Sequence, residues 1–108
     1  RVLCRSITNN YIDADYCIKI DDVNESTIGP NALRSNIGTN KIGIQVGVDT
    51  NSGISGLVIL PNRNVGSSLN TLVDYSADAS RHGVYEITED GVIKTVGKGK
   101  DGKGVGKA

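Results

Sequence analysis

The sequence is poor in the large side chains that usually fill a protein core. Its 108 residues include no Phe, no Trp and no Met, and four Tyr are the only aromatics. A buried core must therefore be built from Ile, Val, Leu and Ala. There is a single His, which limits acid–base chemistry because His is the side chain that ordinarily titrates near neutral pH. At this length we expect one domain.

The sequence also lacks a charge excess and a long apolar run. Twelve basic residues balance twelve acidic ones, which excludes electrostatic capture of nucleic acid or of an anionic membrane by the whole molecule. We expect no nucleic-acid partner and no transmembrane segment, because no apolar run approaches the roughly 18 residues of a membrane span. The chain does not begin with Met, and we interpret it as a processed mature chain.

Only two cysteines are present, Cys4 and Cys17. Their spacing fits neither a CxxC redox motif nor the paired CxxC of a zinc site. Residues 1–7 and 16–22 both have strand-like patterns, and a hairpin that turns at Asn10 places the two cysteines opposite each other. We therefore predict a disulfide, with two reduced and buried thiols as the alternative.

The predicted disulfide indicates an oxidising compartment, so we expect a secreted or cell-surface protein. The sequon Asn24-Glu25-Ser26 agrees with that location and makes Asn24 a candidate glycosylation site.

Two central segments have the patterns of strands. In residues 41–49, apolar residues alternate with Gly43, Gln45 and Gly47, and a face with two glycines permits close approach of another backbone. Residues 56–60 are continuously apolar, which suits a strand covered on both faces, with helices providing one cover.

A helix is predicted over residues 69–82. Leu69, Leu72 and Val73 lie on one stripe of that helix, His82 lies in its last turn, and Gly83 follows as the terminating residue. A shorter helix or an irregular connection is predicted around residues 28–36.

Residues 84–96 have the pattern of a β-hairpin. A three-residue loop ending at Gly91 places that glycine at a left-handed position. In the resulting register Glu86 faces Lys94 and Ile87 faces Ile93, so that charge pairs with charge and apolar with apolar. We prefer this register to the one that a two-residue loop would give.

Together these elements predict an α+β fold, a mostly antiparallel β-sheet with one or two helices packed on a face. A β-sandwich with one short helix is the alternative. Residues 1–96 are expected to form one compact domain, followed by a Gly/Lys-rich tail over residues 97–108. The tail is a candidate interaction segment for an acidic surface, through Lys98, Lys100, Lys103 and Lys107.

The sequence offers little catalytic or metal-binding chemistry. We interpret His82 as structural, and no catalytic residue, metal site or cofactor is predicted. Residues 22–33 begin like an EF-hand loop but lack its glycine and its bidentate Glu. Four acidic residues near the first predicted hairpin could meet a cation in space, although the spacing does not specify such a site: Asp13, Asp15, Asp21 and Asp22.

These observations favour a non-enzymatic module that acts through protein contacts or self-association. An extracellular fibre subunit and an adhesin-like domain are the two forms of this hypothesis. The alternatives are a small secreted toxin or effector, and a small ribonuclease-like enzyme that uses Arg81, His82 and Glu86.

Overall fold

The computed structural model describes residues 6–21, 23–47, 53–75 and 80–96. These ranges contain eleven strands and one short 3₁₀ turn, η1, at Val65–Ser67. In chain order the strands are β1 (Ser6–Ile7), β2 (Tyr11–Asp13), β3 (Tyr16–Ile20), β4 (Val23–Ile28), β5 (Ala32–Arg34), β6 (Ile42–Val46), β7 (Gly53–Ile59), β8 (Arg63–Asn64), β9 (Thr71–Tyr75), β10 (Ser80–Ile87) and β11 (Ile93–Val96).

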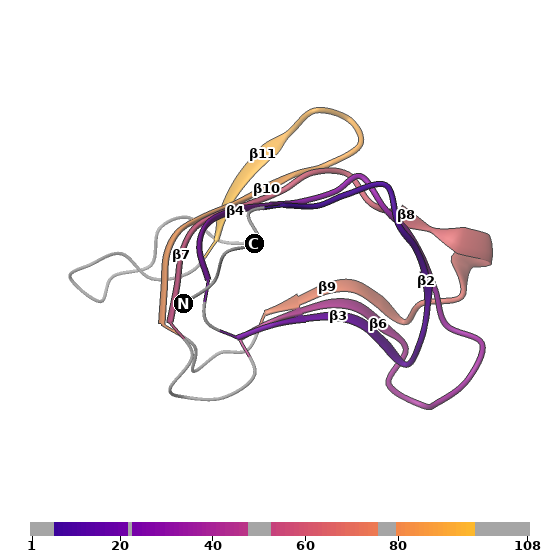
Figure 1. The fold of residues 1–108 in the computed structure, drawn as a ribbon. Helices are drawn as coiled ribbons and strands as arrows, with labels where there is room; N and C mark the ends of the chain where they lie inside the picture. Colours follow the sequence, from indigo (N-terminus) through magenta and orange to yellow (C-terminus); the bar gives the residue numbers. More distant parts are fainter. Residues whose placement is uncertain (1–5, 22, 48–52, 76–79, 97–108) are drawn as a thin grey trace.

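The chain winds repeatedly through the same three sheets. Sheet A has the order β1-β4-β7-β10-β11, sheet B the order β2-β5-β8 and sheet C the order β3-β6-β9. Every pair is parallel except β10 with β11, so each coil passes from A to B to C and returns to A one rung higher. Figure 1 shows the successive coils superposed around a common interior. This topology is a parallel β-helix of three coils that ends in a hairpin.

The core lies inside the coils and is built from rows of stacked aliphatic side chains. Ile18 pairs with Ile44 in sheet C, and Leu57 pairs with Val84 in sheet A. Ile44, Leu57, Val84 and the sheet B residue Leu33 are completely buried. Branched aliphatic side chains suit such rows because identical positions of successive coils meet directly, one strand spacing apart.

A ladder of asparagines lines the corner between sheets A and B. The backbone N–H and the Nδ2 of Asn31 both donate to Oδ1 of Asn62, at 2.9 Å. The backbone N–H and Nδ2 of Asn10 donate in the same way to Oδ1 of Asn31, at 3.0 and 3.2 Å. Asn31 and Asn62 are buried, and the ladder supplies the hydrogen bonds that buried polar groups require where the chain leaves sheet A.

The predicted α+β fold and its alternative, a β-sandwich with one short helix, are both wrong. The sheets are parallel, with the single exception of the terminal hairpin, and η1 is the only helical turn in the described ranges. The segment predicted as a helix over residues 69–82 contains β9 and the start of β10. Its apolar residues match the helical period, but Val73 instead extends the row of Ile18 and Ile44 in sheet C. Residues 28–36 likewise contain β5 and no helix.

The strand predictions in the centre of the chain are confirmed in position. Residues 41–49 contain β6, and a Cβ built on Gly43 would lie 2.5 Å from the carbonyl oxygen of Leu72, so this glycine does permit close backbone approach. Residues 56–59 fall in β7, a central strand of sheet A, and Leu60 directly follows it. The buried side chains of this strand pack into the interior of the coils, and not against the helix that was expected to cover them.

The terminal hairpin has the predicted register. Val84 pairs with Val96, Glu86 with Lys94 and Ile87 with Ile93. Gly91 has a φ of 84°, in the left-handed region that the three-residue loop requires.

The first predicted hairpin is wrong. β1 pairs with β4 and β3 pairs with β6, both in parallel, so the described parts of these two segments do not pair with each other in a hairpin. Cys17 has no disulfide partner among the described residues, and Cys4 lies outside them. The Cys4–Cys17 disulfide thus stays a prediction that has lost the register on which it was based.

Candidate binding face on sheet B

The outer side of sheet B presents five side chains in two rows. Tyr11, Ala32 and Arg63 are in register across β2, β5 and β8, and Asp13 is in register with Arg34. We call these five residues the sheet B face. Tyr11 is 58% exposed, whereas Leu33 of the same sheet points into the core and is fully buried. This alternation follows from the two-residue period of a strand.

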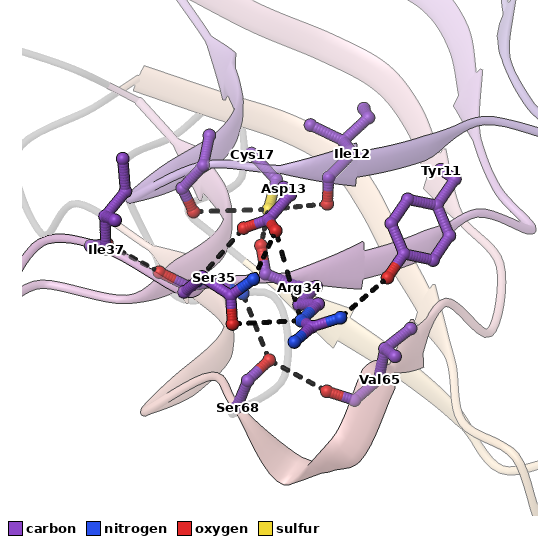
Figure 2. Close-up of polar contacts among 11 residues, drawn as sticks. Tyr11, Ile12, Asp13, Cys17, Arg34, Ser35, Ile37, Val65 and Ser68 are labelled. Carbon is purple, nitrogen blue, oxygen red and sulfur yellow. Dashed lines mark hydrogen bonds and ion pairs between the residues drawn. The ribbon is translucent and has the colours of Figure 1, made fainter.

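Arg34 is held in place by its neighbours on the face. Its Nη1 donates to the Tyr11 hydroxyl at 3.4 Å, its Nε donates to Oδ1 of Asn36 at 3.1 Å, and Nε lies 3.9 Å from Oδ2 of Asp13. Figure 2 shows the guanidinium between the Tyr11 ring and the Asp13 carboxylate. The hydrogen bond with Tyr11 raises the pKa of Arg34 further, so the group is charged at any physiological pH.

Two aspartates anchor the loop that follows β5. Asp13 accepts hydrogen bonds from the backbone N–H and the Nδ2 of Asn36, at 3.0 and 2.8 Å. Asp15 accepts from Nδ2 of Asn40 and from the backbone N–H groups of Asn40 and Lys41, at 2.8 to 2.9 Å. These hydrogen bonds, first that of the Lys41 N–H and next that of the Asn40 side chain, hold the pKa of Asp15 below its usual value.

The same loop passes so close to Asp15 that it needs a glycine. Gly38 has a φ of 91°, and a Cβ built there would lie 2.3 Å from Cγ of Asp15. A side chain at this position would both strain the backbone and collide with the carboxylate. The loop beside the sheet B face is therefore fixed from two sides, by hydrogen bonds and by packing.

A groove of about 510 Å³ runs over the corner next to the sheet B face. Pro30 and Pro61 each directly precede an asparagine of the ladder in the chain, and Tyr11 and Arg63 each directly follow one. All four line the groove, together with Glu89 of the terminal hairpin. The lining thus combines apolar rings with one cationic and one anionic side chain. Such a surface can take both apolar and polar groups of a partner.

Cys17 lies on β3, is half-buried and is not among the residues that line the groove. Its Sγ lies within hydrogen-bonding distance of the carbonyl oxygens of Arg34, Ile12 and Ala14, at 3.2, 3.6 and 3.6 Å, and its single proton can be donated to any one of them (Figure 2). Burial raises the pKa of the Cys17 thiol, which disfavours the reactive thiolate. The structure thus gives Cys17 a packing role.

The residues singled out from the sequence are spread over the molecule. Asn24 is exposed on β4, and its Oδ1 accepts from the Ser55 hydroxyl at 2.6 Å. Arg81, His82 and Glu86 all lie on β10, so the prediction that His82 closes a helix is wrong. The tail lysines lie outside the described residues.

Of the four acidic residues considered for a cation, Asp13 and Asp15 hold the loop after β5, and Asp22 lies outside the described ranges. Within those ranges no three His, Cys, Asp or Glu side chains gather closely enough to hold a metal ion.

Sequence reasoning missed the asparagine ladder and most of the sheet B face. A signal was present: Ile-x-Pro-Asn occurs at residues 28–31 and again at 59–62, and Ile-Thr-Asn-Asn at residues 7–10 is a weaker copy. Ile7, Ile28 and Ile59 are in register in sheet A. A short motif that recurs at intervals of 20 to 50 residues, here roughly 21 and 31, is typical of solenoid proteins.

No family model matches the sequence, and neither a curated protein nor a solved structure matches it. The class is therefore defined by the topology alone, as a short parallel β-helix with a hairpin at its C-terminal end. None of the described residues belongs to a helix long and apolar enough to cross a membrane.

Proposed function

We propose that this protein is a non-enzymatic extracellular module that acts through protein contacts, and that the sheet B face is its contact surface. The observation that carries the proposal is the pair of Tyr11 and Arg34. Tyr11 is 58% exposed, and the guanidinium beside it is already fixed by Asp13 and Asn36. Tyr and Arg are the residues that most often dominate binding energy in protein interfaces.

Preorganisation supports this assignment. A long side chain such as Arg34 ordinarily loses rotamer freedom when it is immobilised in an interface, at a cost of about 0.5–1.5 kcal/mol. Here the intramolecular contacts have already restricted it. The adjoining groove adds a concave surface of mixed polarity next to the exposed ring.

The geometry favours an adhesin-like module over a fibre subunit built by stacking coils. A second copy that placed its β2 on β8 and its β3 on β9 would have to place its β1 on β7. That position is taken by β10, which pairs with β7 along six residues. The terminal hairpin is therefore incompatible with in-register stacking of one coil directly on the next.

Panning a random peptide library on the immobilised protein tests the proposal. Selected peptides should lose binding to Tyr11→Ala about ten-fold or more, as expected for a hot-spot residue. Arg34→Lys keeps the charge but removes the planar fork, and it should also weaken binding. Lys19→Ala is the matched control, because Lys19 is exposed on the outer side of sheet C and packs over Tyr16.

Failure to select any peptide, or selection of peptides that bind Tyr11→Ala as well as the wild-type protein, would refute the assignment. Circular dichroism and urea denaturation of each variant show whether lost binding reflects lost folding. The substitution Asp74→Lys, on sheet C, identifies selected peptides that bind elsewhere on the molecule.

A further inference from the structure

The C-terminal end of the coil stack is a step. Sheet A contains five strands and sheets B and C three each, so β10 and β11 rise beyond the last rungs, β8 and β9. β9 pairs with β6 on one edge, and no strand in the described part of the chain pairs with its other edge. Among the described strands, β9 is thus an edge strand of sheet C, and the hairpin of β10 and β11 lies across the interior from it (Figure 1).

A small cavity lies in the angle of this step. It has a volume of about 130 Å³, and its lining includes Leu72 and Val73 from β9 and Ile87 from β10. Val73 continues the row of Ile18 and Ile44, which are 6% and 0% exposed. Val73 itself is only half-buried, because no described rung covers it. An additional strand with an apolar residue at this position would complete the row.

The outward-facing row of side chains on sheet C ends in an acidic residue, which would pair with a basic residue on the additional strand. This row consists of Lys19, Gln45 and Asp74, in register across β3, β6 and β9. Asp74 ends the row at the step, and Glu86 and Glu89 line the neighbouring cavity. A cation opposite Asp74 would form a favourable cross-strand pair.

We propose that the outer edge of β9 is a docking site for an extended segment of another protein, which adds as a fourth parallel strand of sheet C. The segment carries the pattern apolar–basic–apolar, with its basic residue opposite Asp74. In this mode of recognition, main-chain hydrogen bonds provide affinity and alternate side chains provide specificity. A folded copy of this chain cannot supply the strand from its own coil stack, because β10 blocks its β1. The site is separate from the sheet B face and does not depend on it.

A peptide of residues 15–21, with Ser in place of Cys17, is a suitable probe. It includes the sequence of β3, which already forms a parallel pair of this kind with β6 and has Lys19 between Ile18 and Ile20. Fluorescence anisotropy with the labelled peptide should give saturable binding to the full chain. The protein variant Asp74→Lys should bind the peptide about five-fold more weakly, because an attractive cross-strand pair becomes a repulsive one.

A charge swap provides the matched control. The peptide with Lys19→Glu should bind Asp74→Lys better than it binds the wild-type protein. The peptide with Ile18→Pro should not bind, because proline interrupts strand pairing. Hydrogen exchange at saturating peptide should show new protection of the amides of β9.

Equal binding of the Lys and Glu peptides to both proteins would overturn the proposal, as would protection that appears on β3 and not on β9. The variant Tyr11→Ala separates this site from the sheet B face. This variant should bind the β3 peptide as tightly as the wild-type protein does. The sheet B face and the β9 edge can therefore be tested independently, and failure of one proposal does not decide the other.

Discussion

At the scale of single residues, the structure uses carboxylates to hold its longest described loop. Asp15 receives three hydrogen bonds from Asn40 and Lys41, although these residues lie 25 and 26 positions further along the chain. Its depressed pKa is the signature of those bonds, because they favour the charged carboxylate. A single ionisable group thereby links the end of β2 to the start of β6.

This arrangement makes the stabilising effect of Asp15 depend on pH. Because the folded-state pKa lies below the unfolded value of about 3.9, the contribution is complete above that pH and is lost as the pH falls through the folded pKa. Asp15→Asn should therefore lower the melting temperature near neutral pH, and the difference from the wild-type protein should shrink in acid. Thermal unfolding followed by circular dichroism at several pH values measures both. A difference of the same size at every pH would show that the charge is irrelevant, and Asp74→Asn controls for the loss of one negative charge.

At the scale of secondary-structure elements, the asparagine ladder fixes the corner between sheets A and B. Asn31 is the central member, since it accepts from Asn10 and donates to Asn62 and to the Ile7 carbonyl oxygen. Removing its side chain would take a hydrogen-bond partner from groups of the two neighbouring coils: the Asn10 N–H, the Ile7 carbonyl oxygen and Oδ1 of Asn62. Each such group costs about 1–3 kcal/mol.

We therefore expect Asn31→Ala to lower the free energy of unfolding by about 2–3 kcal/mol, as measured by urea denaturation. Asn70→Ala is the control: its Nδ2 also bonds to two carbonyl oxygens, of Thr39 and Asn40, but at an exposed position. That substitution should cost about 0.5 kcal/mol or less. Similar losses for the two variants would contradict the structural role assigned to the ladder.

The elements also show which parts of the fold could be predicted from sequence. The hairpin of β10 and β11 was predicted with the correct register, because its pairing is local and Gly91 marks the turn. The rungs could not be found in the same way, since aligned residues such as Asn10, Asn31 and Asn62 are separated by 21 and 31 positions. Unequal coil lengths concealed the repeat, and the spacing of Leu69, Leu72 and Val73 happened to fit a helix.

The sheet B face was unpredictable for the same reason. Tyr11, Arg34 and Arg63 come from three successive coils, and only the stacking of those coils brings them onto one surface. The sequence alone places Asp13 only in a cluster of acidic residues. Its actual neighbours are Arg34 and Asn36, which lie more than twenty residues away.

At the scale of the whole molecule, each coil contacts chiefly the coils next to it. Stability in such a stack is approximately a sum of rung and neighbour terms, so it should be greatest in the middle. We expect the amides of β6 and β7, which are paired on both edges, to exchange more slowly than those of β3 and β9, each of which pairs with one other described strand. Hydrogen exchange with mass spectrometry tests this order. Equal rates across the strands would indicate that the stack opens only as a unit.

The order of strands in sheet A also decides how the molecule would respond to tension. β1 and β11 lie at opposite edges of that sheet, with β4, β7 and β10 between them. Force applied between the two edge strands acts across the rungs, so it loads the hydrogen bonds of one rung at a time. The chain would then lengthen in successive increments of one coil, each released at modest force. A molecule of this design yields gradually under load and dissipates work over a long extension.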